Sequence, residues 1–180
     1  MQDCRAKRPE IGVARIGTHV KDPRLDLSDF LPYLVNRVGV IIAEQFSAET
    51  LAPHRLSIAM WRVMAVLASA GGQRQIDLAD LTSIDASTLS RIVTRLVRMG
   101  LVARARSASN NREVVVTLSP RGSALVARLI PRAREIEADA ATGLSADELA
   151  VVKRCLRRVY GNMKGRSAGA GRSQQKRVVG

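Results

Sequence analysis

The sequence feature that most constrains the fold is a change of hydrophobic period at Gly100. Within residues 86–99 the apolar side chains recur at three- and four-residue steps, which is typical of one face of an α-helix. Over residues 101–106 the side chains instead alternate in character at every second position, and a β-branched run follows at 114–117 after a polar tip. This pattern predicts a helix that is followed directly by a β-hairpin.

Helical periods fill most of the remaining chain. The fold class is therefore expected to be mainly α with a small β-hairpin, in the order helix, helix, helix, turn, helix, hairpin, helix, helix. The first predicted helix is capped by Ser28 and closes at Pro53, with Pro32 near its first turn. It is followed by a helix over Ser57–Ala70, a short helix whose apolar side is Ile76, Leu78, Ala79 and Leu81, and a helix capped by Asp85. The last two helices are one from Ser119–Pro120, which Pro131 should kink, and one from the Ser145–Glu148 capping box through Val159.

The ends of the chain differ in composition from the middle. Residues 1–27 predict a flexible basic extension, residues 28–163 one domain, and residues 164–180, where Gly161 has already weakened the last helix, a basic disordered tail. The formal net charge is +13, of which residues 1–24 supply +3 and the tail +5, so the middle keeps +5. We therefore expect an anionic partner, either nucleic acid or an acidic membrane.

The cations of the middle gather beside Gly100. No acidic residue occurs between Asp85 and Glu113, a stretch that holds six arginines. Leu89, Ile92, Val93, Leu96 and Val97 predict a buried stripe on the helix. The opposite, polar face predicted for DNA contact consists of Ser87, Arg91, Thr94 and Arg98, flanked by Thr88 and Arg95, and the hairpin adds Arg104, Arg106 and Arg112.

An α-helix fits the major groove of B-DNA and meets base edges with its first turns. A carboxylate on this surface would repel phosphate, which explains the missing acids. A solvated amphipathic helix beside a surface hairpin is the alternative interpretation. The order of the elements and the acid-free stretch across both helix and hairpin favour DNA binding.

The stretch "QIDLADLTSIDASTLSRIVTRLVRMGLVARARSASNNREVVVTLSPRGSAL" resembles the winged helix-turn-helix core of MarR-type transcriptional regulators. The resemblance extends through "LSIAMWRVMAVLA" and the two closing helices, and so covers about residues 28–163. It implies a winged helix-turn-helix core, with a DNA-binding lobe at about 57–118, joined to a helical dimerisation region.

The resemblance also implies a function. The protein would be a homodimeric, sequence-specific regulator, most simply a repressor of pseudo-palindromic operators that a small-molecule effector modulates. Residues that match recognition-helix positions are Ser87, Thr88, Ser90, Arg91, Thr94 and Arg95, and Arg112 matches the wing arginine. Where the family usually has aspartate two positions before that arginine, this chain has Asn110, which weakens any salt bridge that holds the wing.

Two other classes of function stay open: a winged-helix module for protein interaction and a non-specific architectural DNA-binding protein. The steepness with which salt weakens DNA binding separates the first from a DNA-binding regulator. A preferred DNA site, which an architectural protein lacks, separates the second.

Other reactive residues point to no further chemistry. Cys155 falls on the apolar side of the last helix and is expected to be inert packing, and Cys4 does not match a sensing cysteine. His19 and His54 lack companions at ligand spacing, so we expect no metal and no cofactor. Trp61 is expected in the core, although in the family this helix also borders the ligand pocket.

Serine, histidine and aspartate are not arranged as a catalytic triad, and no enzyme is expected. Arg37 and Arg62 interrupt the longest apolar runs, so we expect no membrane span. The basic N-terminus lacks the hydrophobic segment of a signal peptide, and a cytoplasmic protein is the simplest interpretation.

Overall fold

The computed structural model describes residues 24–106 and 114–175, leaving aside the side chains of Arg106 and of residues 166–175. The chain divides into two compact units, one that ends at Val38 and one that begins at Gly39. The boundary falls inside the first helix, α1 (Leu31–Phe46). The two units are therefore described separately.

In the first unit, Asp26 determines how the chain enters α1. Its carboxylate accepts hydrogen bonds from the amide and the hydroxyl of Ser28, at 2.9 and 2.6 Å. The prediction that Ser28 caps the helix is therefore wrong, because Asp26 engages that side chain and α1 begins only at Leu31. Pro32 lies in the first turn, as predicted, where its missing N–H costs no hydrogen bond.

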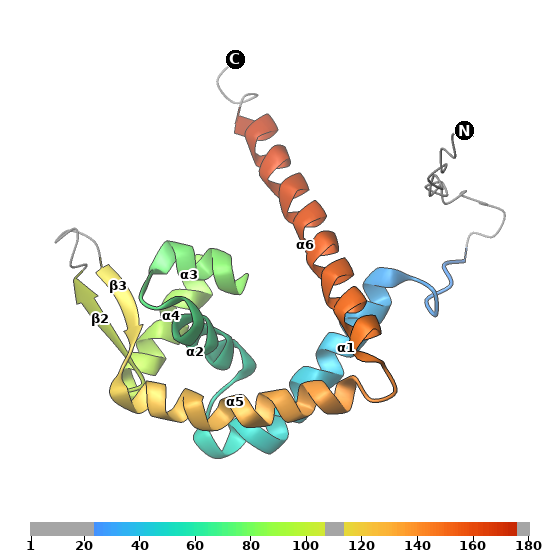
Figure 1. Cartoon of the computed structure of the whole chain (residues 1–180). Helices are drawn as coiled ribbons and strands as arrows, with labels where there is room; N and C mark the ends of the chain where they lie inside the picture. The colour runs from blue at the N-terminus through green and yellow to red at the C-terminus, as the bar shows by residue number, and fades with distance from the viewer. Residues whose placement is uncertain (1–23, 107–113, 176–180) are drawn as a thin grey trace, which may run out of the picture. The chain divides into compact units, whose positions relative to one another are not determined.

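The second unit contains every other predicted helix (Figure 1). After α1 the chain continues through the wider π-helical turn η1 (Ser47–Leu51) and the tighter 3₁₀-helical turn η2 (Ala52–His54). Ser57 caps the next helix by accepting a hydrogen bond from the Met60 amide at 3.3 Å. The helices that follow are α2 (Ile58–Ala70), α3 (Gln75–Thr82), α4 (Ala86–Arg98), α5 (Pro120–Ala140) and α6 (Ala146–Gln175).

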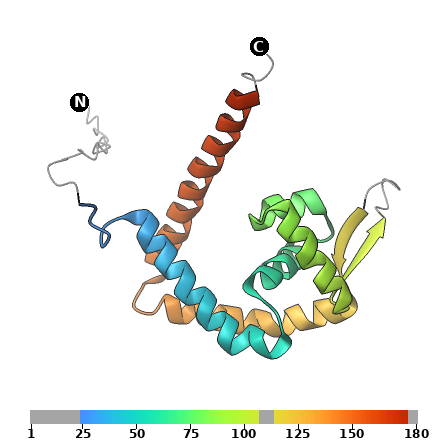
Figure 2. The same cartoon turned by 180° about the vertical axis from the view of Figure 1, so that it is seen from behind.

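The predicted hairpin is confirmed as β2 (Val102–Arg106) paired antiparallel with β3 (Val114–Leu118). A third strand, β1 (Gln73–Arg74), pairs antiparallel with the other edge of β3, which makes β3 the central strand. β1 was not predicted from the sequence, because two residues are too few to show alternation. Figure 2 shows α4 leading down to the base of the hairpin, where α5 begins.

The core of this unit lies among α2, α3, α4, the sheet and the first half of α5. Trp61 is half-buried and packs edge-to-face on Phe46, with the ring centroids 5.3 Å apart, which confirms its expected place in the packing. On α3 the predicted apolar side is only partly right, since Leu78 is buried while Ile76 and Leu81 are exposed. The largest fully buried side chains are Leu51, Met60, Met64, Leu78, Leu89, Leu96, Val63, Val93, Val116, Val126 and Thr82.

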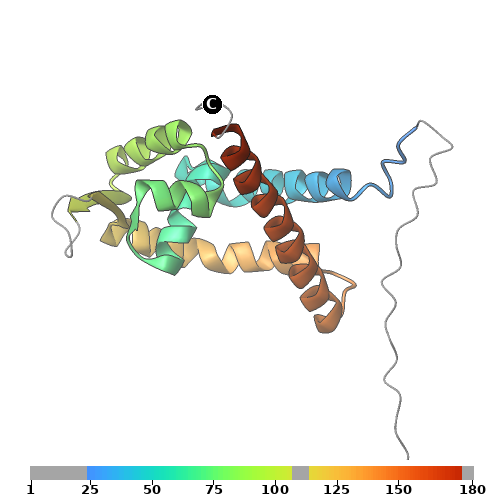
Figure 3. The same ribbon diagram turned by 90° about the horizontal axis from the view of Figure 1, so that it is seen from above.

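Of the two closing helices, α6 is longer than predicted. α5 continues through Pro131 to Ala140. The capping box of α6 is confirmed, because the Ser145 amide donates to Glu148 at 2.8 Å and the Glu148 amide to the Ser145 hydroxyl at 3.3 Å. Figure 3 shows α6 as one continuous helix, and it passes Gly161 and ends only at Gln175, inside the predicted tail.

Apolar side chains on α1 and α6 are exposed in the single chain. The expectation that Cys155 is buried is wrong for this chain alone, because its side chain is exposed on α6. The exposed apolar residues are Leu31, Leu34, Val35, Val38 and Ile41 on α1, and Val151, Val152, Leu156, Val159, Tyr160 and Met163 on α6.

Among the described residues, none of the helices has the length and apolar character to cross a membrane.

Candidate nucleic-acid interface

The interface begins at the turn between α3 and α4. Ser83 has the left-handed backbone angle φ 54°, and the Ile84 amide donates to the Ala79 carbonyl at 3.2 Å. Buried Thr82 donates its hydroxyl to the Leu78 carbonyl at 2.6 Å, so the last turn of α3 satisfies its own polar group. These bonds hold the tight reversal of the chain that sets the direction of α4.

Arg62 braces the same turn from α2. Its guanidinium group donates to the Thr82 carbonyl at 3.4 Å, which satisfies a carbonyl at the free end of α3. From the sequence, Arg62 is recognisable only as a charge that interrupts an apolar run. Nothing in the sequence pattern signals a contact between residues twenty positions apart.

Asp85 caps α4, as predicted. Its carboxylate accepts hydrogen bonds from the Thr88 amide at 2.9 Å and from the Ser87 hydroxyl at 2.7 Å. The amide of Thr88 above all, with the hydroxyls of Thr88 and Ser87, holds the pKa of Asp85 well below its usual value. The ionised carboxylate thus satisfies an amide in the first turn of α4.

The apolar stripe of α4 fixes the rotation of the helix about its axis. Leu89, Val93 and Leu96 are fully buried, and Ile92 is half-buried against the same core. Val97, at the edge of the predicted stripe, is 36% exposed. Because one side of the helix is held in the core, the other side must face outward.

The outward side holds the predicted DNA contacts. Ser87, Arg91, Arg95 and Arg98 are exposed, whereas Thr88, Ser90 and Thr94 are half-buried. In the part of the chain that the structure describes, the side chains of Arg91, Arg95 and Arg98 form no ion pair with a carboxylate. This leaves their guanidinium groups available to an outside anion. The prediction that these residues contact DNA stays a prediction.

A side-chain hydrogen bond couples the hairpin to α4. The Arg104 guanidinium on β2 donates to the Thr94 hydroxyl on α4 at 3.1 Å. The hydrogen bond therefore brings Arg104 to the same surface as Thr94. Arg106 ends β2, and its side chain is outside the described part, as are Asn110 and Arg112.

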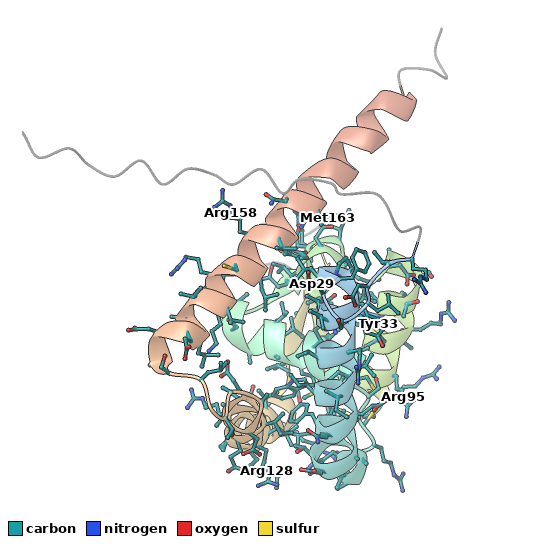
Figure 4. All side chains as sticks on the ribbon, turned by 90° about the vertical axis from the view of Figure 1, so that its right-hand side faces the viewer. Asp29, Tyr33, Arg95, Arg128, Arg158 and Met163 are labelled. Carbon is teal, nitrogen blue, oxygen red and sulfur yellow. The ribbon has the colours of Figure 1, made fainter. Side chains whose placement is uncertain are left out.

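Arg98 differs from the other predicted residues in its position. It lies in the last turn of α4, and it lines a hollow together with residues of α5 and of the loop before α2. The structure thus brings Ser87, Arg91, Thr94, Arg95 and Arg104 toward one surface, while Arg98 also borders a second one. Figure 4 labels Arg95 on α4 and Arg128, another residue of this hollow, on α5, and the two lie well apart.

Two further observations concern what this unit could bind. A pocket of about 480 Å³ lies along α2 and α3, between Trp61, Val66 and Leu81. Within residues 24–106 and 114–175, no three side chains of histidine, cysteine, aspartate or glutamate lie close enough together to hold a metal ion.

Comparison with known proteins agrees with this geometry. The model of the MarR family matches residues 56–114, which include α2, α3, α4 and β2. The HTH-type transcriptional repressor Rv2887 of Mycobacterium tuberculosis is 29% identical over 137 residues, which is 75% of this chain and 98% of that protein. The matched region holds the whole α3–turn–α4 arrangement.

Solved structures show the same fold. The Bordetella bronchiseptica protein BpsR, whose DNA binding 6-hydroxynicotinic acid regulates, is 28% identical with a TM-score of 0.64, over 72% of this chain and 97% of that one. A MarR variant from Escherichia coli, complexed with operator DNA, is 25% identical with a TM-score of 0.64, over 72% and 92%. These relatives are similar to this chain along most of their own length.

Proposed function

The chain is a MarR-type transcriptional regulator with a winged helix-turn-helix fold, and from this premise we propose that it is a homodimeric repressor of a pseudo-palindromic operator. It acts by binding rather than by catalysis, in the cytoplasm where its operator lies. The observation that carries the proposal is the outward face of α4, which presents Arg91 and Arg95 without a neutralising carboxylate among the described residues.

The proposal assigns a task to each part of the interface. The first turns of α4, with Ser87, Thr88, Ser90 and Arg91, enter the major groove and meet base edges. Thr94, Arg95 and Arg104 approach the flanking phosphates, since the Arg104 hydrogen bond to Thr94 holds the hairpin against α4. Arg106 and Arg112 extend this contact along the hairpin, and Arg98 lies at its far edge.

Dimer formation is supported by the exposed apolar faces of α1 and α6. Contiguous apolar surface of this kind marks protein–protein contact in soluble proteins. Two copies would place their α4 helices about 34–36 Å apart, one turn of B-DNA, so that each reads half of the operator. The helices of the dimerisation region would then cover Leu34 and Ile41 of α1 and Leu156 of α6.

Modulation by a small molecule is supported by the pocket beside Trp61. Its volume of about 480 Å³ suits a drug-sized ligand, and it borders α2 and α3, which brace the interface. The relative BpsR, regulated by 6-hydroxynicotinic acid, shows that such control exists among similar proteins. A ligand there would act through its preference for one arrangement of the two DNA-binding lobes.

Selection of bound sequences from a random DNA pool tests the proposal. We expect a palindromic motif whose half-sites are about one helical turn apart. The Arg91→Ala variant should lose roughly 1–3 kcal/mol on the selected site and less on random DNA. The matched control is Arg134→Ala, which removes the same charge from an exposed position on α5. A pool without any enriched motif would overturn the proposal.

A further inference from the structure

We propose that the hollow beside the end of α4 is a binding site for a small polyanion that bears phosphate groups. It is lined from three segments that are distant in sequence, and its volume is about 510 Å³. We name it the arginine pocket. Its lining residues are Pro53, His54, Arg55, Arg98, Met99, Leu101, Arg121, Leu125 and Arg128.

Four arginine residues line this one hollow, and none of its lining residues is an aspartate or a glutamate. In the described part of the chain, Arg55, Arg98, Arg121 and Arg128 also form no ion pair with an acid elsewhere. Like charges that share one concavity repel each other, so the arrangement costs free energy until an anion or solvent ions neutralise it. An anion that contacts several of them at once removes this repulsion.

Local structural demands explain only part of this charge. The C-terminal end of a helix favours a cation, and Arg98 at the end of α4 meets that demand. Arg121 extends toward the same place from α5, since a Cβ added to Gly100 would lie 3.9 Å from its guanidinium nitrogen. The demand of the helix end for a cation does not explain Arg55 and Arg128, because neither residue lies at the end of α4.

The loop residue Arg55 is held in an uncommon backbone conformation. Its φ is 56°, in the left-handed region, which is unfavourable for a residue other than glycine. Its amide donates to the Ala52 carbonyl at 2.9 Å, and the Leu56 amide donates to the Leu51 carbonyl at 3.2 Å. These bonds hold the loop at the rim of the pocket.

The other residues that line the arginine pocket indicate a small ligand that enters the pocket, rather than a macromolecule that lies across its opening. Leu101 and Leu125 are buried in the core and give the hollow an apolar base. Guanidinium groups bind phosphate in a bidentate manner, and their interaction strengthens beside apolar walls. One carboxylate would neutralise a single guanidinium, whereas a diphosphate group carries enough charge for most of the four. The pocket therefore suits a small molecule with a diphosphate group.

The proposal does not depend on the operator, so its test begins with the free protein. Inorganic pyrophosphate is titrated calorimetrically into the full-length chain, at an ionic strength held constant with sodium chloride. We expect saturable binding of wild type, and at least about tenfold weaker binding of Arg128→Gln, which loses one charge-assisted contact. The matched control is Arg134→Gln, which removes the same charge at an exposed position of α5 outside the pocket and should bind as wild type does.

Arg55→Gln provides a second variant on another segment, and thermal melting of each variant shows that the fold is intact. Absent binding to wild type, or equal weakening in Arg128→Gln and Arg134→Gln, would overturn the proposal, because the effect would then be one of net charge. A further arm measures DNA binding without pyrophosphate. If Arg128→Gln weakens DNA binding while pyrophosphate binding is unchanged, the pocket contacts the DNA backbone and the proposal is wrong.

Discussion

Among the glycines of the part of the chain that the structure describes, Gly122 is the one at which the packing leaves least room. A Cβ built there would lie 1.9 Å from the Leu101 carbonyl oxygen, so the first turn of α5 sits directly on the start of the hairpin. Only glycine permits this approach. The contact determines how close α5 lies to the end of α4.

Substitution of Gly122 by alanine is expected to lower the free energy of unfolding by about 2–4 kcal/mol, since a backbone carbonyl must move. Gly161→Ala is the matched control, because nothing lies within 4 Å of its added Cβ on α6. That variant should be neutral or gain up to about 1 kcal/mol from helix propensity. Chemical denaturation of both variants measures the difference, and equal stabilities would contradict this account of Gly122.

The second residue-scale prediction concerns Asp85 and pH. Since hydrogen bonds from Thr88 and Ser87 hold its pKa below the ordinary value of 3.8, the folded state binds its proton less readily than the unfolded state. The stability from the cap is therefore complete above about pH 4 and declines as the pH falls below that value. We expect Asp85→Ala to be less stable than wild type at pH 7, with a gap that narrows in acid. Unfolding curves across this range, with Asp80→Ala as control, would show it, and a gap that widens in acid would refute it.

At the scale of elements, Ser119 links the end of α4 to the start of α5. Its hydroxyl accepts from the Gly122 amide at 3.0 Å and donates to the Gly100 carbonyl at 2.7 Å. We expect Ser119→Ala to lose about 1–2 kcal/mol of stability and Ser119→Thr to keep most of it. Ser145→Ala removes an exposed cap that serves α6 alone and should cost less. Equal losses at the two caps, measured by thermal unfolding, would show that the bond to Gly100 contributes nothing.

The helices and the hairpin were predictable because each leaves a local signal. The stripe from Leu89 to Leu96 repeats with the helical period, and Asp85, Ser119 and Ser145 are strong caps. β1 was missed because Gln73 and Arg74 become a strand only through pairing with β3. The exposure of Ile76 and Leu81 was missed because the short α3 buries its side through Leu78 and Thr82.

The candidate site, too, could be predicted from the sequence only in part. The exposed arginines of α4 could be placed from the rotation that the apolar stripe sets. The Arg62 bond to Thr82, the Arg104 bond to Thr94 and the arginine pocket join residues far apart in the chain, so their contacts depend on tertiary packing. Ser28 failed as a cap because a competing acceptor, Asp26, lies two residues away.

At the scale of the whole molecule, the uncovered apolar faces predict the effect of a charge on assembly. Leu156 on α6 is 43% exposed in the single chain, and we expect Leu156→Glu to yield a monomer in sedimentation velocity experiments. The same variant should bind the operator at least tenfold more weakly, since the two half-sites are no longer engaged together.

Arg154→Glu, two residues earlier on α6 and also exposed, is the control for the introduced charge and should stay dimeric. A dimeric Leu156→Glu protein would mean that this side of α6 takes no part in assembly.

The strand order β1–β3–β2 has a mechanical consequence for any signal that reaches the DNA. Arg74, the residue directly before α3, pairs with Val115, and Gln73 pairs with Val116, so the first half of β3 is tethered to the start of α3. A displacement of α3 must then move the hairpin in the same direction. If a ligand controls DNA binding as proposed, we expect α3 and the hairpin to move together, and not the hairpin alone.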